Sequence, residues 1–302
     1  MKPWIQAFRL RTLPLAVSSI IVGSASAAYL QKLSSYLVFR PVVLVLALLT
    51  AILLQVLSNL ANDLGDHQHG ADNVARVGPK RSVQSGTITP GQMKKAMLIC
   101  GLLAFLAGCA LIVVALGLTV KSLLFLLLGL SAIAAAVKYT FGKDPYGYAG
   151  FGDVSVFLFF GIVGVCGTFY LHSRYFDWPL LLPATAFGLL SAAVLNVNNM
   201  RDIENDRATG KFTVAVRMGG ERARLYHSGL VVGAILCLFV SSQLGSDSHW
   251  LLLSLLSLPI FIVHLKKVWT TTEPRALDPQ LKVLAMGTFF TALLFSLGLI
   301  LA

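Results

Sequence analysis

Long apolar segments constrain this chain more than any other feature of its sequence. About 20 consecutive apolar residues cross the hydrocarbon core of a bilayer as a helix, and nine segments are candidates for this role. They cover residues 13–30, 41–61, 96–120, 122–137, 151–171, 179–197, 228–244, 250–265 and 283–302. Only 12% of the residues are charged, about half the fraction that a soluble domain carries. We therefore expect an all-α, polytopic membrane protein of about nine transmembrane helices, formed as a single integral-membrane domain over residues 1–302.

The basic residues divide unequally between the two sides of the predicted spans. Of the 24 Lys and Arg residues, all but four fall in one set of alternating loops. The four exceptions are Lys32, Arg40, Lys121 and Arg174. Because Lys- and Arg-rich loops stay in the cytoplasm, we expect a cytoplasmic N-terminus and a periplasmic C-terminus. The net charge of +11 then reflects topology, and we expect the lipid bilayer, and no nucleic acid, as a partner.

Two related polar segments follow the second and the sixth span. The first reads NLANDLGD over residues 59–66, and the second reads NNMRDIEND over residues 198–206. Each places an Asn four residues before an Asp, and a second Asp three or four residues later. The segments lie four spans apart and so have the same orientation. This repeat favours two parallel four-helix halves with a ninth helix added, and it argues against the inverted repeat of many transporters.

The paired aspartates predict a magnesium site. Asp63 and Asp66 are three residues apart, and Asp202 and Asp206 are four apart, so each pair lies on one face of a helix. Carboxylates without His or Cys suit a hard cation, and Mg²⁺ typically binds one or two carboxylates together with substrate phosphates. The alternative is that these are ordinary solvated acids at helix ends. Two matched pairs argue against it, because clustered like charges repel unless a cation binds between them. Asp72 extends the first cluster.

Several basic and aromatic side chains near these pairs are candidates for substrate binding. Arg76, Arg201 and Lys211 flank the aspartates and are suited to phosphate oxygens; the alternative is that they serve topology alone. Lys143 is the most favoured catalytic cation, because its loop is short and holds few other charges. Asp153 enters the fifth span, where facing lipid would cost about 2.5–3.5 kcal/mol at full depth, so we expect it to face a cavity.

At these residues the sequence resembles the UbiA-type superfamily of membrane prenyltransferases. The resemblance is carried by residues 10–15, 58–72, 139–160 and 198–219. A third Asp, which often follows the first pair in the family, is replaced here by Gly70, and Asp72 comes after it. This ending resembles the branch of the family that prenylates 1,4-dihydroxy-2-naphthoate.

The resemblance implies a reaction and a set of site residues. The two Asp pairs would bind the Mg²⁺-diphosphate of a polyprenyl diphosphate, and Lys143 would stabilise the departing diphosphate. The acceptor 1,4-dihydroxy-2-naphthoate would lose CO₂ and give demethylmenaquinone in a bacterial inner membrane. The substrate-binding set would comprise Asn59, Asn62, Asp72, Arg76, Tyr139, Tyr146, Asp153, Asn198, Arg201 and Lys211.

Two alternatives remain open at this point. One is the same chemistry with another acceptor, such as 4-hydroxybenzoate or a precursor of haem or chlorophyll. The other is a cation-coupled transporter, which predicts acidic residues near the middle of the spans.

Overall fold

The computed structural model describes residues 2–33, 39–74, 76–244 and 248–302. Within these residues every regular element is a helix. In chain order they are α1 (Lys2–Phe8), η1 (Leu10–Thr12), α2 (Leu13–Leu33), α3 (Pro41–Gln68), α4 (Pro90–Leu116), α5 (Val120–Lys138), α6 (Gly152–Val156), η2 (Phe157–Gly167), α7 (Thr168–Ser173), η3 (Trp178–Leu180), α8 (Leu181–Arg201), α9 (Ile203–Ala208), α10 (Val214–Met218), α11 (Gly220–Ser241), η4 (Ser248–Ser257), α12 (Leu258–Thr270), η5 (Pro274–Leu277) and α13 (Asp278–Leu301).

These helices make nine candidate membrane spans in the described part of the chain, which confirms the predicted all-α polytopic architecture. The two shortest predicted segments prove long enough to cross a bilayer, at 19 residues for Val120–Lys138 and 22 for His249–Thr270. The apolar segment predicted for the second span ends at residue 61, whereas α3 continues to Gln68 and so carries Asp63 and Asp66 on a helix, as their spacing predicted. Polar residues that end an apolar run can continue a helix when they face other protein groups, and here α3 stops only before Gly70, whose φ is 74°.

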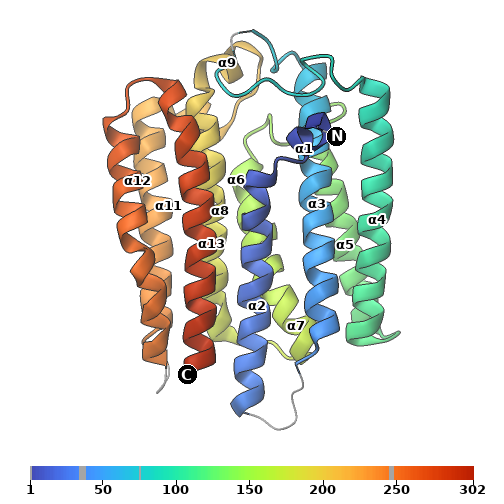
Figure 1. Cartoon of the computed structure of the whole chain (residues 1–302), viewed down its shortest axis with the longest axis vertical. Coiled ribbons are helices and arrows are strands. Elements are labelled where there is room, and N and C mark those ends of the chain that lie inside the picture. The colour runs from blue at the N-terminus through green and yellow to red at the C-terminus, as the bar shows by residue number, and fades with distance from the viewer. Residues whose placement is uncertain (1, 34–38, 75, 245–247) are drawn as a thin grey trace.

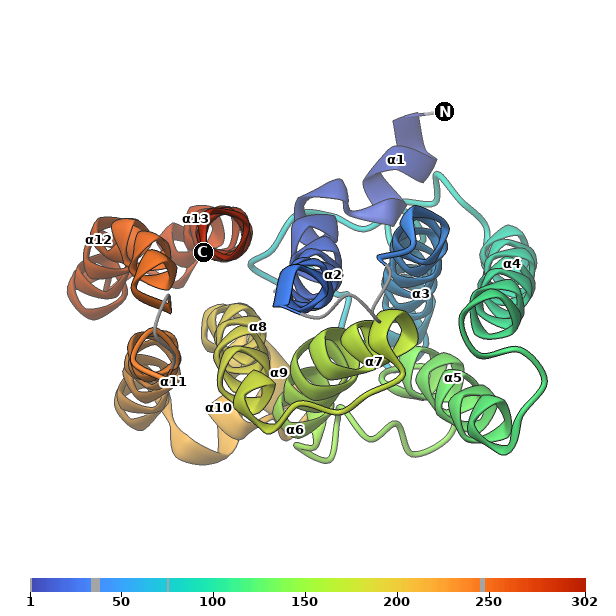
Figure 2. The same cartoon turned by 90° about the horizontal axis from the view of Figure 1, so that it is seen from below.

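The spans stand side by side in one bundle (Figure 1). The second span, α3, packs against α4 and α5, and α8 packs against α11. The last helix, α13, packs against α2 and α8 and so joins the early and late parts of the chain (Figure 2). One end of the bundle holds the N-terminal helix α1, the helix α9 and the loop that follows α3, whereas the C-terminus lies at the other end (Figure 1).

The fifth span is broken into α6, a π-helical segment η2 and α7. Its backbone lies very close to both neighbouring helices, because glycines provide the contacts. A Cβ on Gly161 would lie 2.5 Å from the Ala184 carbonyl oxygen, and one on Gly23 would lie 2.4 Å from the Val165 carbonyl oxygen. Small residues allow this approach between membrane helices, where apolar surface alone gives no driving force for association.

Basic side chains at the far end of the bundle bind the last carbonyl groups of helices. Arg40 donates to the Ala115 carbonyl oxygen at 3.2 Å, and Arg174 donates to the same oxygen at 2.9 Å and 2.8 Å. Lys32 donates to the carbonyl oxygen of Ile300. The last four carbonyls of a helix lack partners within it, so these cations satisfy exposed helix ends.

Candidate active site

The end of α3 carries Asp66 into a cluster of three donors. The Arg81 Nη1 atom lies 2.6 Å from Asp66 Oδ2, and Lys211 Nζ lies 3.5 Å from Asp66 Oδ1. The hydroxyl of Tyr148 also donates to Asp66 Oδ1, at 2.8 Å. Three segments far apart in sequence, namely the loop after α3, the loop after α5 and the loop after α9, therefore meet at this carboxylate.

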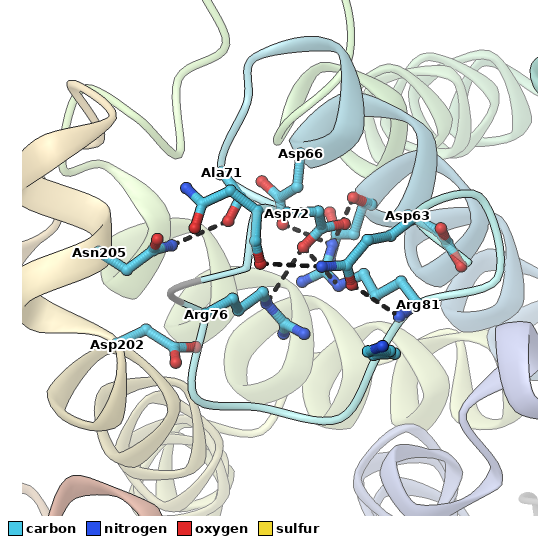
Figure 3. A network of polar contacts seen from close by, with 12 residues as sticks. Asp63, Asp66, Ala71, Asp72, Arg76, Arg81, Asp202 and Asn205 are labelled. Atoms are coloured by element: carbon cyan, nitrogen blue, oxygen red, sulfur yellow. Dashed lines mark hydrogen bonds and ion pairs between the residues drawn. The ribbon is translucent and has the colours of Figure 1, made fainter. Parts of the chain in front are cut away.

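The second acidic segment reaches the same place. Lys211 Nζ lies 3.8 Å from Asp206 Oδ1 as well as close to Asp66, so one ammonium group joins the two acidic segments. The side chain of Asn205 donates to the carbonyl oxygen of Ala71 at 2.8 Å, which ties α9 to the loop after α3 (Figure 3). The two Asn/Asp helix ends thus converge, which is the arrangement that the repeat predicted.

Asp202 is held by an arginine that binds two carboxylates. Arg201 donates to both Asp202 oxygens, at 3.1 Å and 2.6 Å. The same guanidinium donates to Asp278 Oδ1 at 2.5 Å and to Asn198 Oδ1 at 3.0 Å. Because Asp278 begins α13, the ninth span reaches the site through this ion pair.

Asp63 fastens the loop between α3 and α4 over the site. Its two carboxylate oxygens accept the backbone N–H groups of Ser82 and Val83, each at 3.1 Å. Beside it, Arg81 donates to the Asn62 carbonyl oxygen at 2.6 Å, and Asn62 Oδ1 accepts the Thr140 hydroxyl at 2.8 Å.

Asp72 extends this cluster, as the sequence predicted, because it pairs with two arginines of the loop. Its Oδ1 lies 3.1 Å from Arg76 Nε and 3.3 Å from Arg81 Nε (Figure 3). One guanidinium, that of Arg81, therefore links Asp72 to Asp66.

The acids outside the membrane spans differ in how their charge is compensated. Burial raises the pKa of Asp206 to about 6, and the nearby charges of Asp202 and Asp66 act in the same direction against Lys211. Burial acts most strongly on Asp202 and would raise its pKa, but the hydrogen bond and charge of Arg201, together with the charges of Arg76 and Lys211, outweigh burial and lower the pKa. Asp202 is therefore kept ionised, chiefly by Arg201, whereas the positive charge of Lys211 does not offset the burial of Asp206.

The oxygen donors fit a magnesium ion that arrives with a diphosphate. Three buried oxygen atoms have no hydrogen-bond partner in the part of the chain that the structure describes, namely Asp206 Oδ2, Asn199 Oδ1 and Asn205 Oδ1. Within the described residues, no three His, Cys, Asp or Glu side chains form a complete metal site. Mg²⁺ seldom uses such an all-protein cage and usually shares one or two carboxylates with substrate phosphates, so an all-oxygen set of this kind suits it.

A cavity of about 350 Å³ opens from this polar end into the bundle. Arg9, Asp66, Arg81 and Lys211 line the cavity, whose remaining lining is mostly apolar with uncharged polar side chains among it. Along α3 the lining runs from Asp66 to Ala47, which is roughly 28 Å at the rise of an α-helix. The cavity therefore joins a charged head to an apolar body that runs nearly the depth of a bilayer core, about 30 Å.

The structure brings most of the predicted site residues together. Those that line the cavity are Asn59, Asn62, Asp66, Tyr139, Tyr146, Asn198 and Lys211. Those in the adjoining polar network are Asp63, Asp72, Arg76, Arg201, Asp202 and Asp206.

Two predicted residues lie elsewhere. Asp153 is buried, with 4% of its surface exposed, but it is not among the residues that line the cavity. Lys143 is exposed, and its carbonyl oxygen accepts a bond from Lys138 Nζ at 3.1 Å.

The predicted set of site residues omits several others that the structure places at the site. Arg81 and Arg9 are cations that the topology count treats like any other, yet both line the cavity. Arg9 adopts a left-handed conformation with φ of 49°, and its buried Nη2 has no hydrogen-bond partner within the described ranges. Tyr148 belongs to a Tyr/Gly-rich turn that is equally typical of an interfacial belt. Asp278 stands alone near the start of the last span, with no local pattern to mark it.

The chain is similar to proteins of known activity and fold. The model of the UbiA prenyltransferase family matches residues 17–294. The 1,4-dihydroxy-2-naphthoate octaprenyltransferase of Escherichia coli K12 is 44% identical over 99% of this chain and 95% of its own length. The protein of the same name from Mycobacterium tuberculosis is 36% identical over 96% of this chain and 94% of its own length.

Solved structures share the fold. An apo UbiA homologue from Aeropyrum pernix K1 superposes with a TM-score of 0.69 at 16% identity, covering 97% of this chain and 98% of the other. A homologue from Archaeoglobus fulgidus, solved with DMAPP and Mg²⁺, gives a TM-score of 0.63 at 15% identity, covering 97% and 99%. From its sequence, its helical bundle and these relatives, the chain belongs to the UbiA prenyltransferase family.

Proposed function

We propose that this chain, as one integral-membrane domain over residues 1–302, transfers a polyprenyl group from polyprenyl diphosphate to 1,4-dihydroxy-2-naphthoate. CO₂ and diphosphate are released, and the product is the reduced (quinol) form of demethylmenaquinone, because the transfer itself involves no oxidant. The observation that carries the proposal is the meeting of two carboxylate segments at Lys211, at the charged head of an apolar cavity. The naphthoate acceptor is supported by the relatives from E. coli and M. tuberculosis, whose names specify it.

In this proposal Mg²⁺ is held by Asp66, Asp202 and Asp206, with Asp63 beside them, and it supplies positive charge to the leaving diphosphate. Arg9, Arg81 and Lys211 hold the phosphate oxygens that the metal leaves free. These cations are fixed before the reaction, so they stabilise charge as it develops on the leaving group. The role expected of Lys143 is assigned here to Lys211, which lines the cavity where Lys143 does not.

The reaction begins when the allylic C–O bond breaks and its electron pair stays with the diphosphate. The resulting allylic cation lies below Tyr139 and Tyr146, whose rings line the cavity and meet edge to face at 5.5 Å. Aromatic rings attract such a cation. A ring carbon of the naphthoate then attacks it, and CO₂ departs, leaving its bonding electrons to restore the aromatic ring. Apolar walls keep water from the cation.

The tail of the donor reaches beyond the cavity. An apolar cavity of about 150 Å³ holds one benzene molecule, so the 350 Å³ found here accommodates the first few C5 units. The remaining units of a long prenyl chain lie between helices or in lipid. This arrangement suits a bacterial inner membrane, with the charged head of the cavity and the N-terminus on the cytoplasmic side, as the basic loops indicate.

The test is an assay of purified protein in liposomes with farnesyl to octaprenyl diphosphates and the naphthoate, with and without EDTA. Product is scored by mass. We expect Asp63→Ala and Asp202→Ala to abolish turnover while the proteins still insert and fold. Glu204→Ala is the matched control, because Glu204 is exposed on α9 and pairs only with Arg207 among the described contacts. Wild-type activity in either aspartate variant would contradict the proposal.

A competition assay separates the acceptor alternatives, and the positions of the aspartates bear on the transporter alternative. Competition with 4-hydroxybenzoate identifies the acceptor directly. The transporter alternative required acidic residues in the middle of the spans, whereas the structure gathers Asp63, Asp66, Asp202 and Asp206 at helix ends on one side of the bundle.

A further inference from the structure

A glutamine in the wall of the cavity has an unsatisfied oxygen. Gln55 lies on α3 one turn before Asn59, and both line the cavity. The Gln55 amide nitrogen donates to Asn59 Oδ1 at 3.3 Å and to the hydroxyl oxygen of Thr12 at 3.4 Å. Its carbonyl oxygen, Oε1, is buried and has no hydrogen-bond partner among the described residues.

Neighbouring bonds fix which way the Gln55 amide points. Asn59 Nδ2 donates to the Phe8 carbonyl oxygen at 2.9 Å and to Thr12 Oγ1 at 3.1 Å, so Asn59 must present its oxygen to Gln55. The Thr12 hydroxyl donates its hydrogen to the Arg9 carbonyl oxygen at 2.9 Å, so it can only accept a hydrogen bond from Gln55. Turning the Gln55 amide over would set its oxygen against two acceptors. The free atom is therefore an acceptor.

An unsatisfied buried acceptor calls for a ligand with a hydrogen to donate. The two substrates of the proposed reaction differ in this respect. An ionised polyprenyl diphosphate carries only acceptor oxygens and hydrocarbon, whereas a dihydroxynaphthoate carries two phenolic O–H groups. Only the aromatic substrate can satisfy Gln55.

The depth of Gln55 agrees with this assignment. Along α3 it lies seven residues below Asn62 and eleven below Asp66, which is about 10 Å and 16 Å at the rise of an α-helix. A diphosphate held at Asp66 and a two-ring acceptor beneath it would occupy this interval.

We propose that Gln55 Oε1 accepts a hydrogen bond from a ring hydroxyl of the aromatic acceptor, and that Gln55 helps to select a hydroxylated ring. This inference rests on the proposed function and adds a residue-level contact to it. Polar groups built to bind a substrate hydroxyl discriminate strongly against analogues that lack it, because the site is then left unpaired.

The experiment combines one substitution with one change in the substrate. Wild-type protein and Gln55→Leu are assayed in liposomes with 1,4-dihydroxy-2-naphthoate, 1-hydroxy-2-naphthoate and 4-hydroxy-2-naphthoate. Wild-type protein should lose about tenfold or more in kcat/KM when the bonded hydroxyl is removed. Gln55→Leu should show about the same loss with the dihydroxy substrate, and its ratio of kcat/KM between the dihydroxy substrate and that analogue should be about tenfold smaller than in the wild type, because only the wild type loses a hydrogen bond together with the hydroxyl. The KM for polyprenyl diphosphate should not change.

Two further variants keep the test sharp. Gln55→Met retains the length of the side chain without its carbonyl and should repeat the result if Gln55→Leu does not fold. Thr50→Val is the matched control, because Thr50 lines the same cavity and its hydroxyl is already bonded to the Leu46 carbonyl oxygen at 2.8 Å. It should retain wild-type selection between the three acceptors.

The outcomes distinguish the two proposals. Unchanged dependence on both hydroxyls in Gln55→Leu, or an equal rise in the KM of both substrates, would overturn the role of Gln55 and leave the prenyl transfer standing. Absence of prenyl transfer by the wild-type chain to any of these acceptors would overturn the proposed function itself.

Discussion

Asp278 offers the most quantitative test of how the site controls its metal. The buried guanidinium of Arg201 is shared between Asp202 and Asp278, and the Asp278 side chain is 30% exposed. In Asp278→Asn the full positive charge of Arg201 falls on Asp202, so Mg²⁺ must compete with a stronger ion pair. A hydrogen bond to a charged group contributes about 1.5–3 kcal/mol. Taking the low end, because Asp278 is partly exposed, gives roughly tenfold weaker Mg²⁺ binding.

The assay measures initial rates of prenyl transfer against free Mg²⁺ at saturating substrates. We expect the half-saturating Mg²⁺ concentration to rise about tenfold, with little change in the rate at saturating Mg²⁺. Glu204→Gln is the control, since its pair with Arg207 is 83% and 50% exposed, and such surface pairs contribute little. An unchanged or lower Mg²⁺ requirement in Asp278→Asn would refute the reasoning.

Three other predictions follow from single contacts. Since burial raises the pKa of Asp206 to about 6, the Mg²⁺-dependent rate should fall as the pH drops through 6, and more Mg²⁺ should move that midpoint to lower pH in pH–rate profiles. Tyr148→Phe removes a 2.8 Å donor from Asp66 and should raise the KM for polyprenyl diphosphate about three- to tenfold, because Tyr148 orients that carboxylate. Gly65→Ala places a Cβ 2.4 Å from a backbone oxygen, whereas a Cβ at Gly91 meets no described atom within 4 Å. Only Gly65→Ala should therefore lower the melting temperature in detergent, and its loss of unfolding free energy should be about 1–3 kcal/mol.

The fold could be predicted closely from apolar segment lengths, because a membrane leaves helices as the simplest way to satisfy a spanning backbone. The inner boundaries could not. The apolar run that ends at residue 61 belongs to a helix that continues to Gln68, since Asp63 and Asp66 find partners in the loop between α3 and α4 and need no water. Hydropathy registers the polarity of such residues and carries no information about their partners.

The site could be predicted where it repeats and not where it is assembled from single residues. Two matching Asn/Asp segments indicated a shared site, and Lys211 does join them. A charge count could not separate Arg81, which contacts Asp66 directly, from Lys143, which is exposed. Gln55 carries no motif, and its significance comes only from the bonds that orient it.

The cations at the far end of the bundle change how the charge distribution of the chain should be weighed. Four basic residues lie outside the loops predicted to be cytoplasmic. Three of them donate to carbonyl groups at the end of a helix, namely Lys32, Arg40 and Arg174. A polypeptide that crosses lipid repeatedly has to complete its backbone bonding at every turn-around, and a long basic side chain is one way to do so. Such basic residues donate to carbonyl groups at helix ends that have no partner within the helix, and they are compatible with translocation of the segment that carries them. Only Lys121, which lies 5.7 Å above the ring of Tyr170, then remains outside this explanation.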